Sequence, residues 1–472
     1  MMNVTRRTGR SGVALAALGV LVLAGCESLL EVDDTGFILP ESLEEAGPSA
    51  VPAFVNGMVG AYQEAFDDIV LYTSLITDEM IAAGTFSTRL QVDNRRIQPN
   101  NGTLTGEIYT PLHHARQQAD TTVLMLQGKL QDPRFAESSD ELRKGIALGG
   151  LFGGYTRLWL GEMYCWSILT GMFPESRPIL PNARVQQAVS FLQDAETRAA
   201  AAGLADIRLA AIVGQARAQL WLRNYSAAAN LAARVPRDFV FWMEYSHNTP
   251  GQYNEVYMVT HGDQSLIDWT VGTGELRIRG NERWEHLDGF LQLNLLEDRP
   301  EGFEANVSTI PVVLQTLYNR PDSDIMMASG VEAMLIRAEA AVRAGQTAVA
   351  AELLNDLRAD YSRRINLQQR VDLPDDEDQL QPLTLTGNLA ADVETVLAER
   401  ARELWLTGDR HTTSRRLRLE PSLSLNLFPS VKFAVGGGDD ISFPIVQQEL
   451  DNNPNLSTAD ACPPGQEMGF WR

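Results

Sequence analysis

The sequence contains little cysteine and little histidine, and its acids outnumber its bases. Among 472 residues there are 3 Cys and 6 His, and 61 Asp and Glu stand against 39 Lys and Arg. Three cysteines in so long a chain exclude a small scaffold held together by disulfides. The formal net charge of −22 repels phosphates, so we expect no binding of nucleic acid by this chain.

Short catalytic and metal-binding motifs are also missing. The chain has no Gly-x-Ser-x-Gly elbow, no phosphate-binding loop and no His-Glu-x-x-His sequence. His113 and His114 are neighbours on a predicted helix, so their side chains point about 100° apart and do not face one metal ion. From these patterns we predict no catalytic residue, metal ligand or cofactor. A glycosidase stays open as an alternative, because it needs only two carboxylates that lie anywhere in the sequence.

The first 25 residues predict a lipoprotein signal peptide. Several arginines precede an apolar stretch over 12–24, which is too short to span a bilayer. The stretch ends in Leu-Ala-Gly-Cys, which is typical of a bacterial lipobox, so we predict that Cys26 carries the lipid anchor. Glu27 follows in place of the Asp that retains lipoproteins in the inner membrane, which favours the outer membrane.

After cleavage, the chain would keep Cys165 and Cys462 in an oxidising compartment. One interpretation is that these two cysteines form a disulfide, and the other is that they are two separate thiols. The sequence leaves both open, because the distance between the two Cα atoms decides the matter.

Beyond the leader, the chain is interpreted as an acidic, irregular stalk over 26–48 and a body over 49–472. Apolar residues at spacings of three and four predict a hairpin of two helices over 51–83. The next segment, 85–105, is rich in Asn and Arg and is interpreted as a functional loop. Further helical patterns cover 107–130, 140–169, 188–202, 206–222, 331–342, 350–357 and 391–407.

These patterns predict a mostly all-α fold built from helix pairs of the tetratricopeptide type. The segments 188–236 and 331–357 each place small residues where two helices would cross. The segment 140–169 contains many glycines, each of which costs about 1 kcal/mol in a helix relative to alanine. The simplest reason for them is a close approach of neighbouring helices.

An irregular insertion over 239–320 interrupts the helical array and contains the aromatic candidates for ligand binding. Aromatic rings offer apolar faces on which sugars or peptides stack, while Asn and Arg side chains bond to hydroxyl groups. The candidates are Trp269, Trp284, Trp242 and Tyr245 in the insertion and Arg89, Asn94, Arg95 and Arg96 in the earlier loop. The alternative is that the aromatics pack the insertion onto the helices and that the loop charges are solvated.

Two charged clusters have structural interpretations. Glu399, Arg400, Arg402 and Glu403 lie at spacings that suit salt bridges within and between helices better than an acid–base pair. The acidic run over 375–378 lacks the glycine and the spaced ligands of an EF-hand loop. We interpret it as a solvated loop, and a structural calcium stays open.

Several islands, in the same order along the chain, resemble the SusD/RagB family of outer-membrane nutrient-uptake lipoproteins. They are the lipobox with residues 28–32, the helix start at 57–62, the Glu-Arg-Ala-Arg-Glu-Leu stretch at 399–404 with the Gly-x-Arg turn at 408–410, and Phe-Pro-Ile at 443–445. The resemblance implies a bundle of tetratricopeptide-like pairs whose irregular insertion forms the ligand face. It also implies a partner, a SusC-like TonB-dependent transporter, and exposure of the lipoprotein at the cell surface.

Some positions depart from the family pattern. Thr407, His411 and Thr413 stand where the family often has Glu, Trp and Asp, so the identity of a ligand does not transfer. The function we predict is a non-catalytic lipoprotein that binds oligosaccharides or peptides and delivers them to the transporter. The alternatives are a tetratricopeptide-type envelope scaffold without a small ligand and a lipid-anchored glycosidase.

Overall fold

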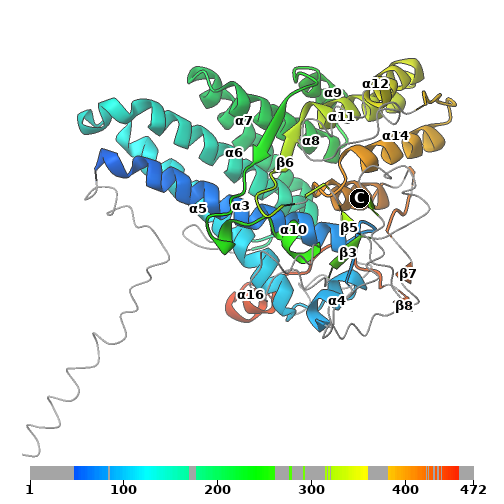
Figure 1. Ribbon diagram of the computed structural model, residues 1–472, viewed down its shortest axis with the longest axis horizontal. Helices are drawn as coiled ribbons and strands as arrows, with labels where there is room; N and C mark the ends of the chain where they lie inside the picture. The colour runs from blue at the N-terminus through cyan, green and yellow to red at the C-terminus, as the bar shows by residue number, and fades with distance from the viewer. Residues whose placement is uncertain are drawn as a thin grey trace, which may run out of the picture. The chain divides into compact units, whose positions relative to one another are not determined.

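Helical periodicity in the sequence becomes helix over most of the body (Figure 1). The computed structural model describes residues 47–82, 86–169, 177–260, 276–278, 291–292, 314–315, 317–318, 320–359, 381–420, 422–423, 425–428, 431–432, 435–436 and 438–456. The mostly α-helical fold class that the sequence predicts is confirmed.

The helices and short strands have the following bounds. The helices are η1 (Pro48–Ala50), α3 (Val51–Ile76), α4 (Ser87–Asp93), the π-helix η2 (Leu104–Tyr109), α5 (Thr110–Lys129), η3 (Pro133–Ser138), α6 (Ser139–Met163), α7 (Pro181–Ala201), α8 (Ala205–Trp221), α9 (Tyr225–Ala232), η4 (Pro250–Gln252), α10 (Glu255–Thr260), α11 (Gly330–Arg343), α12 (Thr347–Ala359), α14 (Leu389–Glu403), α15 (Asp409–Arg418) and α16 (Gln447–Asn452). The strands are β1 (Met80–Ala82), β2 (Val240–Met243), β3 (Leu276–Ile278), β4 (Leu291–Gln292), β5 (Leu314–Gln315), β6 (Ile325–Ser329), β7 (Val431–Lys432) and β8 (Val435–Gly436).

Helix α3 is one continuous element, so the prediction of a two-helix hairpin over 51–83 is wrong. Asp67 and Asp68, where the sequence pattern was divided, both lie inside the helix. The carboxylate of Asp67 accepts hydrogen bonds from the backbone N–H groups of Asp68 and Glu255, both at 3.0 Å. A segment far away in the sequence therefore supplies a hydrogen-bond partner for Asp67, an acid whose local sequence suggested the end of a helix.

The segment 85–105 is also more regular than predicted, because helix α4 occupies part of it. The chain leaves α4 at Asn94 and turns at Arg95, whose φ of 53° lies in the left-handed region. The backbone N–H of Gly438 donates to the Asn94 carbonyl at 2.6 Å, so a late segment of the chain holds this turn. Such a contact has no signal in the local sequence.

The glycines of α6 confirm the predicted close approach of helices. A Cβ atom at Gly145 would lie 2.5 Å from Leu126 of α5, and one at Gly154 would lie 2.7 Å from Leu192 of α7. Helix α6 packs against both of these neighbours. Side chains larger than hydrogen would push the helices apart, which explains why α6 tolerates residues that weaken an isolated helix.

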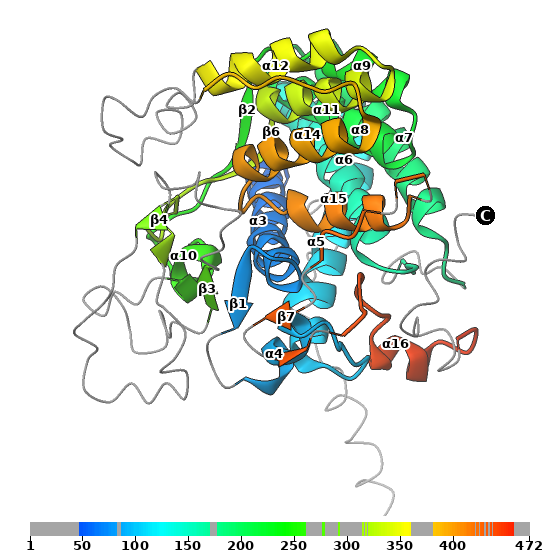
Figure 2. The ribbon, with the colours of Figure 1, turned by 90° about the vertical axis from the view of Figure 1, so that its right-hand side faces the viewer.

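Helix pairs of the predicted kind follow in sequence. Helix α8 packs on α7 and α9, and α11 packs on α9, α12 and α14. Figure 2 shows α12 and α9 together at the top of the view, above α11 and α8. Gly345 forms the turn between α11 and α12 with a φ of 71°, a conformation that glycine adopts without strain. Apolar residues from α11, α12 and α14, among them Leu335, Leu354 and Val396, form a shared core.

The described strands pair in twos, and every named pair is antiparallel. The most extensive pair joins β2 to β6, with Trp242 opposite Met326. Strand β6 leads directly into α11, so the pair connects the start of the insertion to the second helix pair. Across the described ranges, no helix is long and apolar enough to cross a membrane.

Candidate functional site

A polar pocket lies between helix α3 and the segment that follows strand β2. Its volume is about 290 Å³, near the lower end of the size of small-molecule sites. The described lining comes from one face of α3 and from the 245–253 segment: Asn56, Val59, Gly60, Gln63, Glu64 and Asp67 on the helix, and Tyr245, Gly251, Gln252 and Tyr253 opposite it. Spacings of three and four along α3 place the helix residues on one face. We call this cavity the α3 pocket.

Hydrogen bonds fix the 245–253 segment against the helix. The Tyr245 hydroxyl donates to the backbone carbonyl of Gln63 at 3.1 Å. The side chain of Gln63 in turn donates to the carbonyl of Glu244. The backbone N–H of Tyr245 donates to Asp324 Oδ1 at 3.1 Å, which ties the segment to the chain just before β6. The wall of the α3 pocket is therefore preformed rather than a loose loop.

Carboxylates gather at the end of the α3 pocket next to α10. Burial raises the pKa of Asp67 well above its ordinary value, and the negative charges of Glu255 and Glu64 raise it further. The hydrogen bonds that Asp67 accepts from the backbone N–H groups of Glu255 and Asp68 lower this pKa but do not offset the rise. Burial, followed by the charge of Asp67, also raises the pKa of Asp68. Since each charge raises the pKa of another, these acids lie within electrostatic reach of one another.

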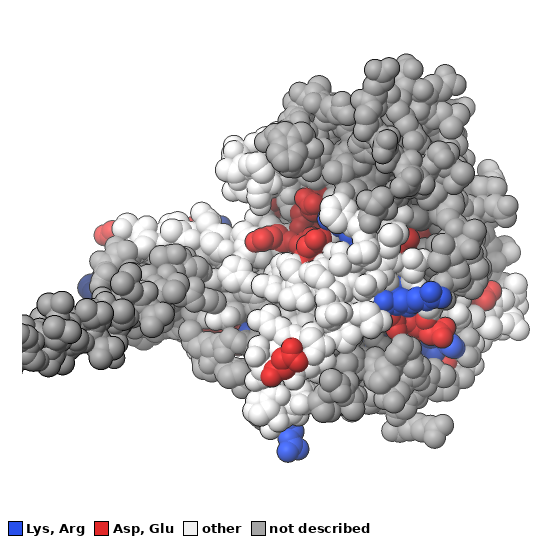
Figure 3. Space-filling model, turned by 90° about the horizontal axis from the view of Figure 1, so that it is seen from below, with Lys and Arg blue, Asp and Glu red and all other residues white. Residues whose placement is uncertain are grey.

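Charge on the described surface is uneven. Figure 3 shows acidic side chains gathered near the middle of the face that is seen from below. The described lining of the α3 pocket contains Glu64 and Asp67 and no Lys, Arg or His. Within the described ranges, no group of His, Cys, Asp or Glu has a geometry that would hold a metal ion.

Gly60 leaves the α3 pocket open on the helix side. A Cβ atom at this position would meet no described atom within 4 Å, in contrast to Gly145 and Gly154 of α6. Helix packing therefore does not require glycine here, although glycine weakens the helix by about 1 kcal/mol relative to alanine. Glycine at this position leaves the helix backbone uncovered at the wall of the α3 pocket.

The lining combines groups that suit a polyhydroxylated ligand. The rings of Tyr245 and Tyr253 offer apolar faces, and the amides of Asn56, Gln63 and Gln252 offer donors and acceptors. Sugars need both kinds of contact, since their ring faces carry C–H groups and their edges carry hydroxyls. The α3 pocket is thus chemically suited to bind a carbohydrate.

Comparison with known proteins bears on the fold. No family model and no curated protein sequence matches the chain. A SusD superfamily protein from Bacteroides vulgatus, 14% identical, aligns with a TM-score of 0.58 over 87% of this chain and 98% of its own. Surface glycan-binding protein A from Bacteroides uniformis, 12% identical, aligns with a TM-score of 0.61 over 86% and 98% of the two chains. The fold is SusD-like.

A third structure carries the same likeness. A SusD-like carbohydrate binding protein from Bacteroides fragilis is 13% identical and aligns with a TM-score of 0.62 over 87% of this chain and 99% of its own. The predicted resemblance to SusD-like proteins is therefore confirmed at the level of the fold. Two of these three proteins are named for binding glycans or carbohydrates.

In this SusD-like body, the predicted aromatic candidates have different surroundings. Tyr245 lines the α3 pocket. Trp242 is half-buried in β2 and packs against the core shared by α11, α12 and α14. These contacts fit the alternative interpretation, in which the aromatic residues pack the insertion onto the helices. Trp269 and Trp284 lie outside the described residues, so their role as ligand contacts stays a prediction.

The polar candidates near α4 are held by neighbouring side chains. Arg89 donates to the Tyr72 hydroxyl and to Glu107 Oε2, both at 3.2 Å. The guanidinium of the buried Arg95 lies 5.4 Å from the centre of the Phe428 ring.

The other two polar candidates lie beside Arg95. Asn94 is half-buried, and Arg96 is exposed. None of the four candidates lines the α3 pocket, and a role in ligand binding for Arg89, Asn94, Arg95 and Arg96 stays a prediction.

Other sequence predictions fall on parts of the chain that are not described. Cys26 with its leader, the acidic run 375–378 and Cys462 lie outside the described residues. Cys165 is fully buried and disulfide-bonded, which favours the interpretation that it is not a free thiol.

The charged cluster at the end of α14 has the structural role that the sequence predicted. Arg400 Nε donates to Asp409 Oδ2 at 2.8 Å, which joins α14 to α15. Glu399 accepts from Arg402 in the same helix and from Arg358 of α12 at 2.6 Å. These are salt bridges within and between helices.

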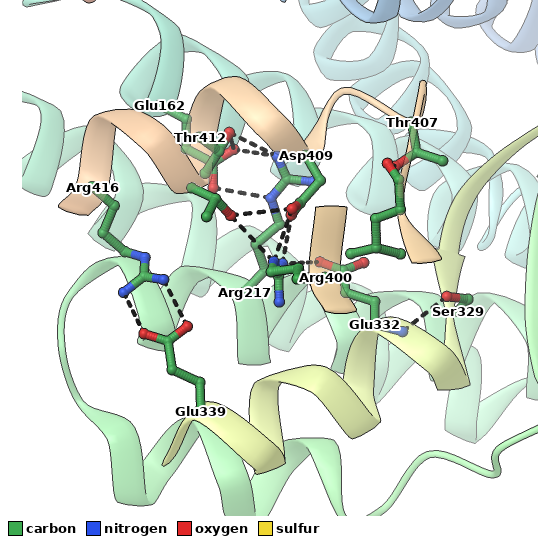
Figure 4. Close-up of polar contacts among 12 residues, drawn as sticks. Glu162, Arg217, Ser329, Glu332, Glu339, Arg400, Thr407, Asp409, Thr412 and Arg416 are labelled. Atoms are coloured by element: carbon green, nitrogen blue, oxygen red, sulfur yellow. Dashed lines mark hydrogen bonds and ion pairs between the residues drawn. The ribbon is translucent and has the colours of Figure 1, made fainter. Parts of the chain in front are cut away.

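The same network continues into the core of the SusD-like body (Figure 4). Arg217 of α8 holds Glu162 of α6 with two hydrogen bonds of 3.0 and 2.7 Å. Arg416 of α15 holds Glu339 of α11 in the same two-pronged way, at 2.9 and 2.8 Å. Buried bidentate pairs of this kind hold four helices in one arrangement.

Glu332 of α11 is not held by an arginine in this two-pronged way among the described residues. Its Oε1 lies 3.6 Å from Arg400, beyond hydrogen-bond distance, and accepts no hydrogen bond from the described residues. Burial raises the pKa of Glu332 to about 7, although Arg217 and Arg400 pull it down. A cavity of about 10 Å³, close to the size of one water molecule, lies beside this side chain.

Sequence reasoning missed the helix wall of the α3 pocket. Gln63, Glu64 and Asp67 belong to a helix that the sequence presents as an ordinary core element. Gly60 lies on an exposed helix face without a packing reason, but the sequence alone does not separate it from the glycines that packing requires. Whether a glycine is needed for packing can be judged only once the neighbouring elements are placed.

Proposed function

We propose that this protein binds oligosaccharides in the α3 pocket and delivers them to a TonB-dependent outer-membrane transporter. The observation that carries the proposal is the preformed pocket of about 290 Å³ with tyrosines and amides on facing walls. The SusD-like fold supports it, because structures with this fold include proteins named as glycan-binding and carbohydrate-binding. Trp269 and Trp284 are proposed as further stacking residues around the same ligand.

The proposal includes an anchor and a place in the cell. Lipidation at Cys26 would hold the protein at the outer membrane, and the stalk over 26–48 would carry the body, 49–472, away from the lipid. A SusC-like barrel is the proposed partner at the cell surface. The protein is proposed to be non-catalytic: a delivery protein must bind its ligand and release it unchanged.

Direct binding to glycans tests the central claim. Isothermal titration calorimetry against a panel of neutral and charged oligosaccharides is expected to find a ligand with a dissociation constant in the range of about 1 μM to 1 mM. Gly60→Phe places a ring in the α3 pocket and is expected to abolish this binding. Gly128→Phe is the matched control, because Gly128 also lies in a helix, is exposed and meets no described atom within 4 Å.

Two further measurements separate this function from its alternatives. A native pull-down from detergent-solubilised outer membrane is expected to recover a large TonB-dependent barrel in stoichiometric amount. Recovery of assembly factors alone, with no glycan bound in calorimetry, would favour the envelope scaffold. Turnover of a bound glycan, followed by chromatography, would favour the glycosidase.

A further inference from the structure

We infer that the α3 pocket selects glycans that carry a positive charge, such as amino sugars with a free ammonium group, over neutral and anionic glycans. The inference rests on the proposed function, since it names the class of ligand for the same pocket. It follows from the charges that line the pocket, the charges behind them, and the contacts of two basic side chains in and beside the loop wall.

Every charged residue in the described lining of the α3 pocket is acidic. Glu64 is exposed on the face of α3 that forms the wall, and Asp67 lies one turn further along the same face. Both carboxylates belong to the same wall as the amide of Asn56 and the open backbone at Gly60. An ammonium group donates three hydrogen bonds, and carboxylate and amide oxygens accept them.

More acids stand directly behind this wall. Glu255 donates its backbone N–H to Asp67, which fixes the first turn of α10 beside α3. The charges of Glu64, Asp67 and Glu255 all raise the pKa of Asp68. Mutual repulsion among these acids destabilises their charged forms, and a cation bound in the pocket would relieve it. A carboxylated or sulfated sugar would add to the repulsion.

Two basic side chains in and beside the loop wall contact Asp322. His247 Nδ1 lies 3.3 Å from Asp322 Oδ2, and Arg320 Nε lies 2.9 Å from Asp322 Oδ1. Neither His247 nor Arg320 lines the α3 pocket. Glu64, the exposed acid of the wall, therefore has no basic partner within the described lining, and its charge is available to a ligand.

Gly60 supplies the space that such a contact needs. Because a Cβ atom here would meet no described atom within 4 Å, a sugar ring can lie against the helix backbone between Asn56 and Glu64. In that position an amino group on the ring lies next to the Glu64 carboxylate. Selectivity then comes from a charge pair in a partly enclosed site, where attraction is stronger than in bulk water.

The test compares glycans that differ in one group. The probes are a chitosan oligomer, its fully N-acetylated form and an oligogalacturonate of equal length, titrated by calorimetry at a pH below the pKa of the sugar amine, so that the amine keeps its proton. The protein is expected to bind the chitosan oligomer about tenfold more tightly than the acetylated form, and the oligogalacturonate least. This preference is expected to shrink as salt is added, because the contact is electrostatic.

Variants assign the preference to the pocket. Glu64→Gln is expected to reduce the preference severalfold while leaving the affinity for the acetylated form unchanged. Glu352→Gln is the matched control: Glu352 is an exposed acid on helix α12, outside the pocket, and the change in net charge is the same. Its preference is expected to equal that of the unchanged protein.

Each contrary result has a separate meaning. Equal affinity for the three probes, or a preference for the oligogalacturonate, overturns the inference and leaves glycan binding intact. A preference that persists unchanged in both Glu64→Gln and Gly60→Phe also overturns it, because the charge would then be recognised elsewhere. Absence of binding to every glycan tested refutes the proposed function itself.

Discussion

Replacing Glu332 with glutamine is expected to stabilise the protein above neutral pH. The glutamine keeps the shape of the side chain and removes the charge. Arg217 keeps its two hydrogen bonds to Glu162, and Arg400 keeps Asp409, so the change leaves no cation without its main carboxylate. The cost that disappears is the burial of an ionised carboxylate whose Oε1 accepts no hydrogen bond from the described residues.

The size of the effect follows from the pKa of Glu332. A rise from 4.5 in the unfolded chain to about 7 in the native protein corresponds to about 3 kcal/mol. The native protein holds the proton more tightly than the unfolded chain does. The contribution of Glu332 to stability is therefore fully present below pH 4.5 and is lost as the pH rises through about 7. Glutamine has no such dependence.

Urea unfolding of both proteins at about pH 5 and about pH 8 measures this difference. Glu332→Gln is expected to raise the free energy of unfolding by up to about 3 kcal/mol at the higher pH and by much less at the lower pH. A variant that is less stable than the unchanged protein at about pH 8 would refute the reasoning, because Glu332 would then be a net stabilising partner of Arg400.

Glu339, on the same helix, provides a control, because its pKa is shifted in the opposite direction from that of Glu332. Burial raises its pKa, but the ion pairs with Arg416 and Arg343 outweigh burial, and the net pKa lies below the ordinary value. Its contribution to stability is thus present above pH 4.5 and lost as the pH falls. Glu339→Gln is expected to destabilise the protein by about 3–5 kcal/mol near neutral pH, and the loss should diminish in acid.

The remaining predictions concern packing and ion pairs. Gly60→Ala is expected to raise the free energy of unfolding by about 1 kcal/mol, since the added methyl group meets no described atom and alanine favours helix. Gly161→Ala is expected to lower it, because the Cβ would lie 2.7 Å from Val185 and 3.0 Å from a backbone oxygen; equal melting temperatures for these two variants would contradict the packing argument. Arg217→Met is expected to cost about 3–5 kcal/mol in urea unfolding, because it leaves Glu162 buried without its partner, and a loss below about 1 kcal/mol would count against this account.

Local sequence was informative where local rules control the structure. The period of apolar residues predicted α6, α8 and α11 because each helix buries one face or is wholly buried. The glycines of α6 and the charges at 399–402 were assigned to helix packing and salt bridges, and the structure shows both. In these cases the partners lie in helices whose own patterns are strong.

Predictions failed where a distant segment compensates for an unfavourable local signal. Asp67 lies inside α3 because the backbone of Glu255 supplies a hydrogen bond across the fold. Arg95 adopts a left-handed turn whose neighbour Asn94 accepts a hydrogen bond from Gly438. Local propensity does not include such contacts, so the sequence suggested a helix break and a long loop instead.

The sequence alone sufficed for the helical class, the helix pairs and the resemblance to SusD-like proteins, because these depend on periodicity and on short motifs in order. The α3 pocket needed the folded chain. Its walls come from residues 56–67 and 245–253, and the bond that joins them runs from the Tyr245 hydroxyl to the Gln63 carbonyl at 3.1 Å. A site assembled from segments so far apart has no local signature, since its chemistry arises only when packing brings two unremarkable surfaces face to face.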